Sequence, residues 1–131
     1  MAEVVADVGL YAELPSDANV SLALLDGVGE AEGLLRVEDE SGVTLVLNDA
    51  VFNMPHLPGM QGWVLKNVTA SSGGPRVSRV GRFFLVKDKA AFVAHLERLA
   101  ATPGLVRVIV SHHQTITDRP ADALRAAAAT L

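Results

Sequence analysis

Three side chains that can bind a metal ion follow two apolar segments of this 131-residue chain. Asp49 comes after the run of residues 43–47, and His112 and His113 come directly after residues 105–110. Zinc accepts both carboxylate and imidazole ligands, at about 2.0–2.2 Å. In layered α/β proteins, side chains at the carboxyl ends of strands line the ligand crevice. If both segments are strands, Asp49, His112 and His113 are therefore candidate ligands of a zinc ion.

Each candidate also has a purely structural interpretation. A metal site needs three or four ligands, and Asp49, like Asn48 and Asn53, is typical of a turn that follows a strand. The paired histidines could equally begin a surface loop. Of the other histidines, His56 lies in a proline-rich loop and His95 lies beside the apolar stripe of a predicted helix. The residues alone leave both interpretations open and identify no catalytic group.

The pattern of apolar residues predicts four strands and three helices. The strands are residues 20–25, 33–37, 43–47 and 105–110, and the helices are residues 59–70, 88–101 and 118–131. The acidic loop of residues 38–42 joins two of the strands in a hairpin. The run VTLVLN is apolar nearly throughout, so this strand is expected to be buried on both faces. Residues 4–12 fit either a short strand or a helical turn.

The clearest helix begins at Asp88, whose side chain is a good N-cap. Apolar residues recur from Phe92 at i, i+4 and i+7, which is the spacing of one buried helix face. The last helix is expected to be capped by Asp118, with Pro120 in its first turn. The segments between these elements, residues 50–58 and 71–75, are predicted to be irregular.

The order of elements predicts one α/β domain that spans residues 1–131. A group of antiparallel strands followed by helix, helix, strand and helix is typical of packed layers around one core. The expected architecture is a layered α/β sandwich with a mixed sheet.

The composition excludes several classes of function. Cysteine is absent, so disulfides, thiolate metal sites and cysteine nucleophiles are ruled out. The net charge is −4 and the basic residues are scattered, which argues against a nucleic-acid partner. Residues 1–10 lack the basic region of a secretory signal, and no apolar run is long enough to span a bilayer. We expect a cytoplasmic protein with no membrane contact.

Four segments resemble the metallo-β-lactamase fold, and in particular a branch of metallo-hydrolase-like proteins of unassigned function. The segments are TLVLNDAVFN, FFLVKDKAAFVAHLERL, RVIVSHHQTI and DALRAAAATL. They follow the order in which that branch carries its middle strand, a helix, its last core strand and a closing helix. The resemblance covers residues 20–131 and implies the C-terminal half of an αββα sandwich.

The same resemblance implies roles for the candidate ligands. Asp49 takes the place of the aspartate that bridges two metal ions, and His112 takes the place of the histidine that completes the second site. His113 stands where the family has glycine, so the choice between the two histidines stays open. The H-x-H-x-D-H motif, which supplies most of the family's metal ligands, is absent from this sequence. The implied zinc centre is therefore incomplete in this chain.

Three explanations fit the missing motif. The chain could be a fragment or half-domain, it could be a short relative of the family that has lost the metal centre, or it could restore a full αββα sandwich by pairing with another chain. We expect a non-catalytic, degenerate metallo-β-lactamase-like domain that serves as a dimerisation or small-ligand scaffold. The alternative is a zinc-dependent hydrolase whose site is completed by another chain or half-domain. Exposed strand edges pair readily, so we expect a homodimer formed through a VTLVLN edge or through the helix that carries Met60 and Trp63.

Overall fold

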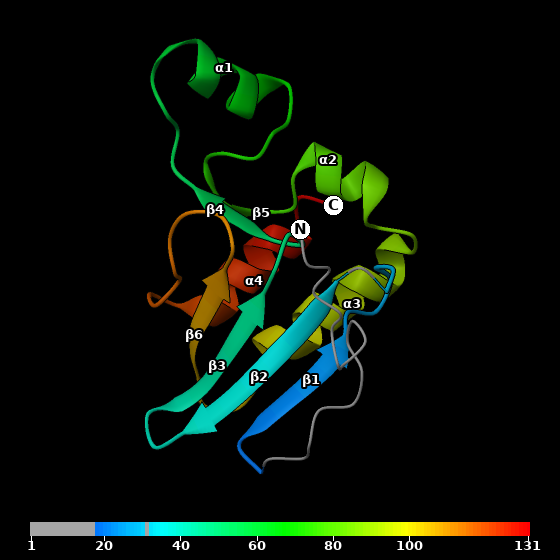
Figure 1. Cartoon of the computed structure of the whole chain (residues 1–131), viewed down its shortest axis with the longest axis vertical. Helices are drawn as coiled ribbons and strands as arrows, with labels where there is room; N and C mark the ends of the chain where they lie inside the picture. Colours follow the sequence, from blue (N-terminus) through cyan, green and yellow to red (C-terminus); the bar gives the residue numbers. More distant parts are fainter. Residues whose placement is uncertain (1–17, 31) are drawn as a thin grey trace, which may run out of the picture.

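The computed structural model describes residues 18–30 and 32–131 (Figure 1). The strands are β1 (Val20–Leu24), β2 (Gly33–Asp39), β3 (Gly42–Leu47), β4 (Phe52–Met54), β5 (Gly74–Arg76) and β6 (Leu105–Val110). The helices are α1 (Gly59–Asn67), α2 (Arg79–Phe84), α3 (Lys89–Ala100) and α4 (Pro120–Ala128). Residues 4–12, predicted as a strand or a helical turn, lie outside the described residues.

A four-stranded mixed sheet forms the centre of the fold. Its strand order is β1-β2-β3-β6, and all neighbours are antiparallel except β3 and β6, which run parallel. The prediction of an α/β fold with a mixed sheet is confirmed. The apolar strand β3 lies between β2 and β6, so the prediction that VTLVLN forms an exposed edge is wrong. The crossover that brings β6 against β3 joins segments far apart in the sequence, which local patterns do not report.

Helices α3 and α4 lie side by side and pack on one face of the sheet (Figure 1). Phe92 and Leu96 of α3 and Leu124 of α4 are fully buried in one cluster with Leu45 and Val108 of the sheet. The predicted spacing along α3 therefore identified its buried face correctly. This cluster is the main core.

Two polar contacts fix α3. A carboxylate oxygen of Asp88 accepts a hydrogen bond from the backbone N–H of Ala91 at 3.0 Å, which caps the helix as predicted. Nδ1 of His95 accepts a hydrogen bond from the backbone N–H of Asp26 at 2.8 Å. Burial lowers the pKa of His95 below its ordinary value of 6.5, which favours the neutral, accepting ring. His95 is therefore a structural residue, as its place in the sequence indicated.

The second face of the sheet is also apolar. Leu35 of β2, Val46 of β3 and Ile109 of β6 are aligned by the strand register and are partly buried. They do not belong to the main core cluster. Strand β3 thus carries apolar side chains on both faces, as its sequence predicts.

Residues 50–86 depart most from the sequence-based expectation. The segments predicted to be irregular contain the short strands β4 and β5, which pair antiparallel, and Ser71 and Ser72 are buried. The six-residue helix α2 was not predicted; the side chain of its N-cap, Ser78, accepts a hydrogen bond from the Gly81 N–H at 3.0 Å. Strands of three residues, and a helix of six residues that makes fewer than two turns, contain too few positions for a periodic pattern to emerge.

Helix α4 begins later than predicted. Its N-cap is Arg119, which has a left-handed φ of 44° and makes no side-chain capping hydrogen bond. The prediction that Asp118 caps this helix is therefore wrong. Pro120 occupies the first turn, where its fixed φ suits the helix. Its ring also disfavours a right-handed helical conformation at the preceding residue, which sets the start of α4.

Helix α1 lies apart from the sheet, at the top of the view in Figure 1. It confirms the helix predicted in this region, but its apolar residues are not part of the core: Trp63 is 61% exposed. Phe83 and Phe84 of α2 are 79% and 82% exposed. We call the exposed apolar side chains of α1, its C-cap and α2 the apolar patch: Met60, Trp63, Val64, Val68, Val80, Phe83 and Phe84.

No helix within residues 18–30 and 32–131 has the length and apolar character needed to cross a membrane.

Candidate functional site

Two pairs of polar residues meet just beyond the parallel strands β3 and β6. The last paired residues of these strands are Leu47 and Val110. The two residues that follow each strand then face each other. The Ser111 hydroxyl donates to Oδ1 of Asn48 at 2.6 Å, and Nε2 of His112 lies 2.8 Å from Oδ1 of Asp49. The structure thus brings the carboxylate of Asp49 and the imidazole of His112 into direct contact.

Other contacts orient this pair. The ring of Phe52 stacks on the ring of His112, with centroids 4.8 Å apart and an interplanar angle of 2°. The backbone N–H of Asp49 donates to Oε2 of Glu32 at 3.2 Å. Both side chains of the pair are nonetheless 46% exposed, so a ligand can reach them. The pair is held in place on one side and open to solvent on the other.

Glu32 is a buried carboxyl group directly behind Asp49. It is only 2% exposed, and this burial is the largest cause that raises its pKa above the ordinary value of 4.5. The negative charge of Asp49 raises the pKa further, while the hydrogen bond from the Asp49 N–H lowers it. Sequence reasoning missed Glu32 because nothing in its neighbourhood distinguishes it from the surface acids of this chain.

The Asp49–His112 pair lines a pocket of about 250 Å³. Most of the other lining residues are apolar and come from α2 and the residue after it. The lining residues are Asp49, Phe52, Ser78, Val80, Gly81, Phe84, Leu85 and His112. The pocket therefore combines one hydrogen-bonding end with an apolar body, which is typical of small-ligand sites.

His113 has a different environment from His112. Its φ of 74° is in the left-handed region, which is strained for most residues other than glycine. Its backbone forms an isolated bridge with Asn53. Of the two histidines, His112 is the one that contacts Asp49. The side chain of another candidate, His56, is bonded to Ser72, with 2.9 Å between Nδ1 and Oγ.

The donor set does not fit a complete zinc site. Asp49 and His112 offer two ligands, whereas protein zinc sites use at least three. Within residues 18–30 and 32–131, no three His, Cys, Asp or Glu side chains gather closely enough to hold a metal ion. The set Asp49, His112 and His113 is therefore not assembled around one point, and no reaction step through zinc can be derived from these residues.

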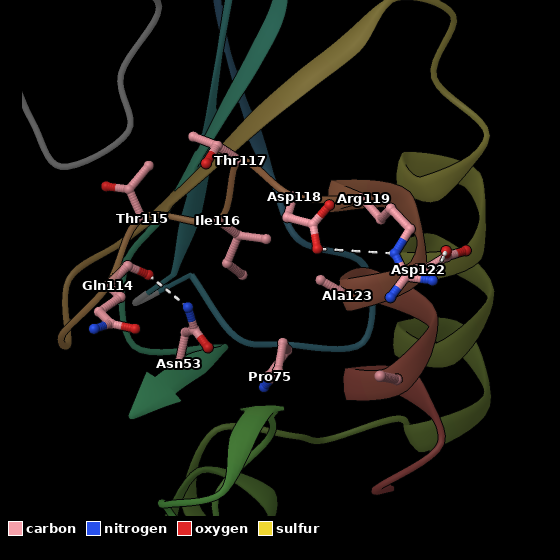
Figure 2. A pocket seen from close by; sticks show the side chains of 11 residues that line it. Asn53, Pro75, Gln114, Thr115, Ile116, Thr117, Asp118, Arg119, Asp122 and Ala123 are labelled. Carbon is pink, nitrogen blue, oxygen red and sulfur yellow. Dashed lines mark hydrogen bonds and ion pairs between the residues drawn. The ribbon is translucent and has the colours of Figure 1, made fainter. Parts of the chain in front are cut away.

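A second pocket of about 420 Å³ lies beside the loop that joins β6 to α4 (Figure 2). The amide nitrogen of Asn53 donates to the carbonyl of Gln114 at 2.8 Å. Arg119 lies between Asp118 and Asp122, with both ion pairs at 3.9 Å. The charged groups of this pocket therefore satisfy one another, and neither Asp49 nor His112 lines it.

A scan against models of known protein families finds no match for this chain, and a search of curated proteins finds none either.

Proposed function

We propose that this chain is a degenerate, non-catalytic metallo-β-lactamase-like domain that binds a small ligand at the Asp49–His112 pocket and serves as a dimerisation scaffold. The observation that carries the proposal is the 2.8 Å contact between Asp49 and His112, which are 63 residues apart in the sequence. These are the two residues onto which the family resemblance places metal-binding roles. Their meeting at one pocket supports the kinship, and the lack of a third ligand among the described residues supports a degenerate centre.

The pocket favours a ligand with one polar group on an apolar body. The polar end offers a carboxylate oxygen and an imidazole nitrogen, and the stacked Phe52 and exposed Phe84 supply the apolar surface. In such sites the apolar contacts give affinity and the few polar groups fix orientation. No residue of this pocket is assigned a catalytic role.

The metal content of the purified protein tests this proposal. We expect far less than one zinc ion per chain after incubation with zinc and dialysis against zinc-free buffer, because protein zinc sites use at least three ligands and this pair offers two. We also expect no increase in melting temperature on zinc addition. The test variant is Asp49→Ala with His112→Ala, and the matched control is Asn48→Ala with Ser111→Ala, the adjacent pair. Stoichiometric zinc that is lost in the test variant and kept in the control would contradict the proposal.

That contradicting result would favour the second candidate, a zinc-dependent hydrolase completed by another chain or half-domain. The apolar second face of the sheet supports this alternative, because an αββα sandwich packs another sheet against such a face. Leu35, Val46 and Ile109 lie on it outside the main core. In that case zinc should be found only in the assembled fraction of a size-exclusion separation.

The homodimer of this proposal has two candidate contacts. One is the edge strand β1, where Leu24 is exposed, and the other is the apolar patch with Trp63 and Phe84. Exposed apolar patches of this kind mark interaction sites. Light scattering should give the mass of a dimer for the wild type. If Leu24→Ser is monomeric, the contact is the β1 edge; if the double variant Trp63→Ser with Phe84→Ser is monomeric, the contact is the apolar patch. A monomeric wild type would contradict the homodimer.

A further inference from the structure

We propose that three arginines around the start of α2 form a binding pocket for the phosphate group of a ligand. The pocket measures about 300 Å³ and is lined by Ala70, Arg76, Val77, Arg79, Arg82 and Thr130. Arg79 and Arg82 are three residues apart on α2 and so lie on one side of it. Arg76 ends the preceding strand β5. The local fold therefore gathers three cations at one hollow.

Among the residues that the structure describes, the three arginines have no acidic partner. No ion pair joins Arg76, Arg79 or Arg82 to a described Asp or Glu, in contrast to the arginines at positions 36, 98, 119 and 125. Residues 50–87 contain five Lys and Arg and no Asp or Glu at all, although the whole chain has a net charge of −4. A pocket whose positive charges have no acidic partner within residues 18–30 and 32–131 favours the binding of an anion.

Hydrogen bonds to backbone carbonyls hold two of the guanidinium groups in position. Nη1 of Arg79 donates to the carbonyl of Asn67 at 2.7 Å, and Nη1 of Arg76 donates to the carbonyl of Ala70 at 3.4 Å. Nε of Arg76 is buried and has no hydrogen-bond partner among the described residues. Buried N–H groups normally have a partner. An anion in the pocket would provide one.

The chemistry of the donors favours phosphate. A guanidinium group is planar and presents paired N–H donors that match two oxygens of a phosphate. Three such groups carry more positive charge than a phosphate monoester or diester carries negative charge, and their N–H donors can satisfy several of its oxygens. Arg79 also lines an adjoining open hollow of about 550 Å³ with Val68, Val80, Phe83 and Phe84. The phosphate can therefore belong either to a free ion or to a headgroup that carries apolar chains.

Titration of the 131-residue chain with inorganic phosphate tests the pocket, with sodium chloride of matched ionic strength as the reference. We expect phosphate to raise the melting temperature above that reference, since a ligand that binds only the folded state stabilises it. Arg82→Gln, an exposed position, should weaken phosphate binding about tenfold because it removes charge-assisted hydrogen bonds. Arg76→Gln should do the same, and Arg36→Gln, outside the pocket, is the control.

A second arm identifies the source of the phosphate group. Flotation with vesicles of phosphatidylglycerol is compared with vesicles of phosphatidylcholine, for the wild type and the same variants. Binding of inorganic phosphate alone, lost in Arg82→Gln and Arg76→Gln, supports a soluble ligand. Binding to phosphatidylglycerol that is lost in these variants and kept in Arg36→Gln supports a lipid headgroup. No binding in either arm, or binding that all three variants retain, would overturn the proposal.

Discussion

Two regions of the molecule differ in the burial of their apolar side chains and in the pairing of their charged ones. One is the layer formed by the four-stranded sheet, α3 and α4, and the other is the segment of residues 52–86. In the layer, apolar side chains such as Phe92 point inward, and charged groups pair with one another, as Arg98 does with Asp26. In the segment, apolar side chains such as Phe84 point outward, and three arginines have no acidic partner among the described residues. The helix-covered side of the layer is buried within the chain, whereas the segment presents groups that a ligand or a partner would satisfy.

Two phenylalanines provide the sharpest test of this difference. Phe92→Ala removes a fully buried ring of the layer and should lower the free energy of unfolding by about 3–5 kcal/mol. Phe84→Ala removes a ring that is 82% exposed, and the free energy of unfolding should change by no more than about 0.5 kcal/mol. Urea denaturation of both variants measures the contrast. Equal losses would show that Phe84 contributes as much packing energy as Phe92, contrary to its exposure.

Two polar residues extend the test. His95→Ala deprives the Asp26 N–H of its acceptor and should cost about 1–2 kcal/mol, whereas Arg82→Gln should leave stability nearly unchanged without phosphate. Because burial lowers the pKa of His95, the unfolded chain binds a proton more readily than the folded one. The contribution of His95 to the free energy of unfolding should therefore be fully present above pH 6.5 and decrease as the pH falls through the lowered pKa. Urea titrations at several pH values should show that this part of the pH dependence is absent from His95→Ala.

The strand-end site lies between the two regions, and Glu32 tests how it is built. The folded state raises the pKa of Glu32 above 4.5, so the folded chain binds a proton more readily than the unfolded one. Ionised Glu32 should therefore decrease stability as the pH rises from 4.5 through the raised pKa. Glu32→Gln keeps an acceptor for the Asp49 N–H and should remove this decrease, so its advantage over the wild type should appear at neutral pH and vanish near pH 4. A variant less stable at both pH values would show that the carboxylate itself is required.

The smallest expected effect concerns His113. His113→Gly relieves a left-handed φ of 74° but adds flexibility to the unfolded chain, so a net gain of about 0.5 kcal/mol is expected. Thermal unfolding of this variant beside His112→Gly measures it. A loss of stability in His113→Gly would mean that the His113 imidazole stabilises the fold by more than the backbone strain destabilises it.

The contrast between the regions also explains what the sequence could predict. The strands of the layer and α3 were found because their buried residues repeat with the period of the element, as from Phe92 along α3. The meeting of Asp49 and His112 was expected from one rule, that side chains at the carboxyl ends of strands line the ligand crevice of layered α/β proteins. Helix α2 was not predicted because its aromatic residues are exposed and so do not produce the spacing of a buried helix face. The burial of Glu32 was not predicted because it depends on which distant segments of the chain cover this residue.

The site at the strand ends depends on the pairing of β3 with β6, which has the largest sequence separation of the strand pairs in the described residues. Asp49 and His112 meet only when β6, entering after α3, has aligned in register beside β3. Contacts of such long sequence separation are slow to form, since a large loop must close first. An intermediate that contains the β1–β2–β3 hairpins alone would have no Asp49–His112 pair. The imidazole resonance of His112 would therefore report the completion of folding, and binding competence would arise in the same step.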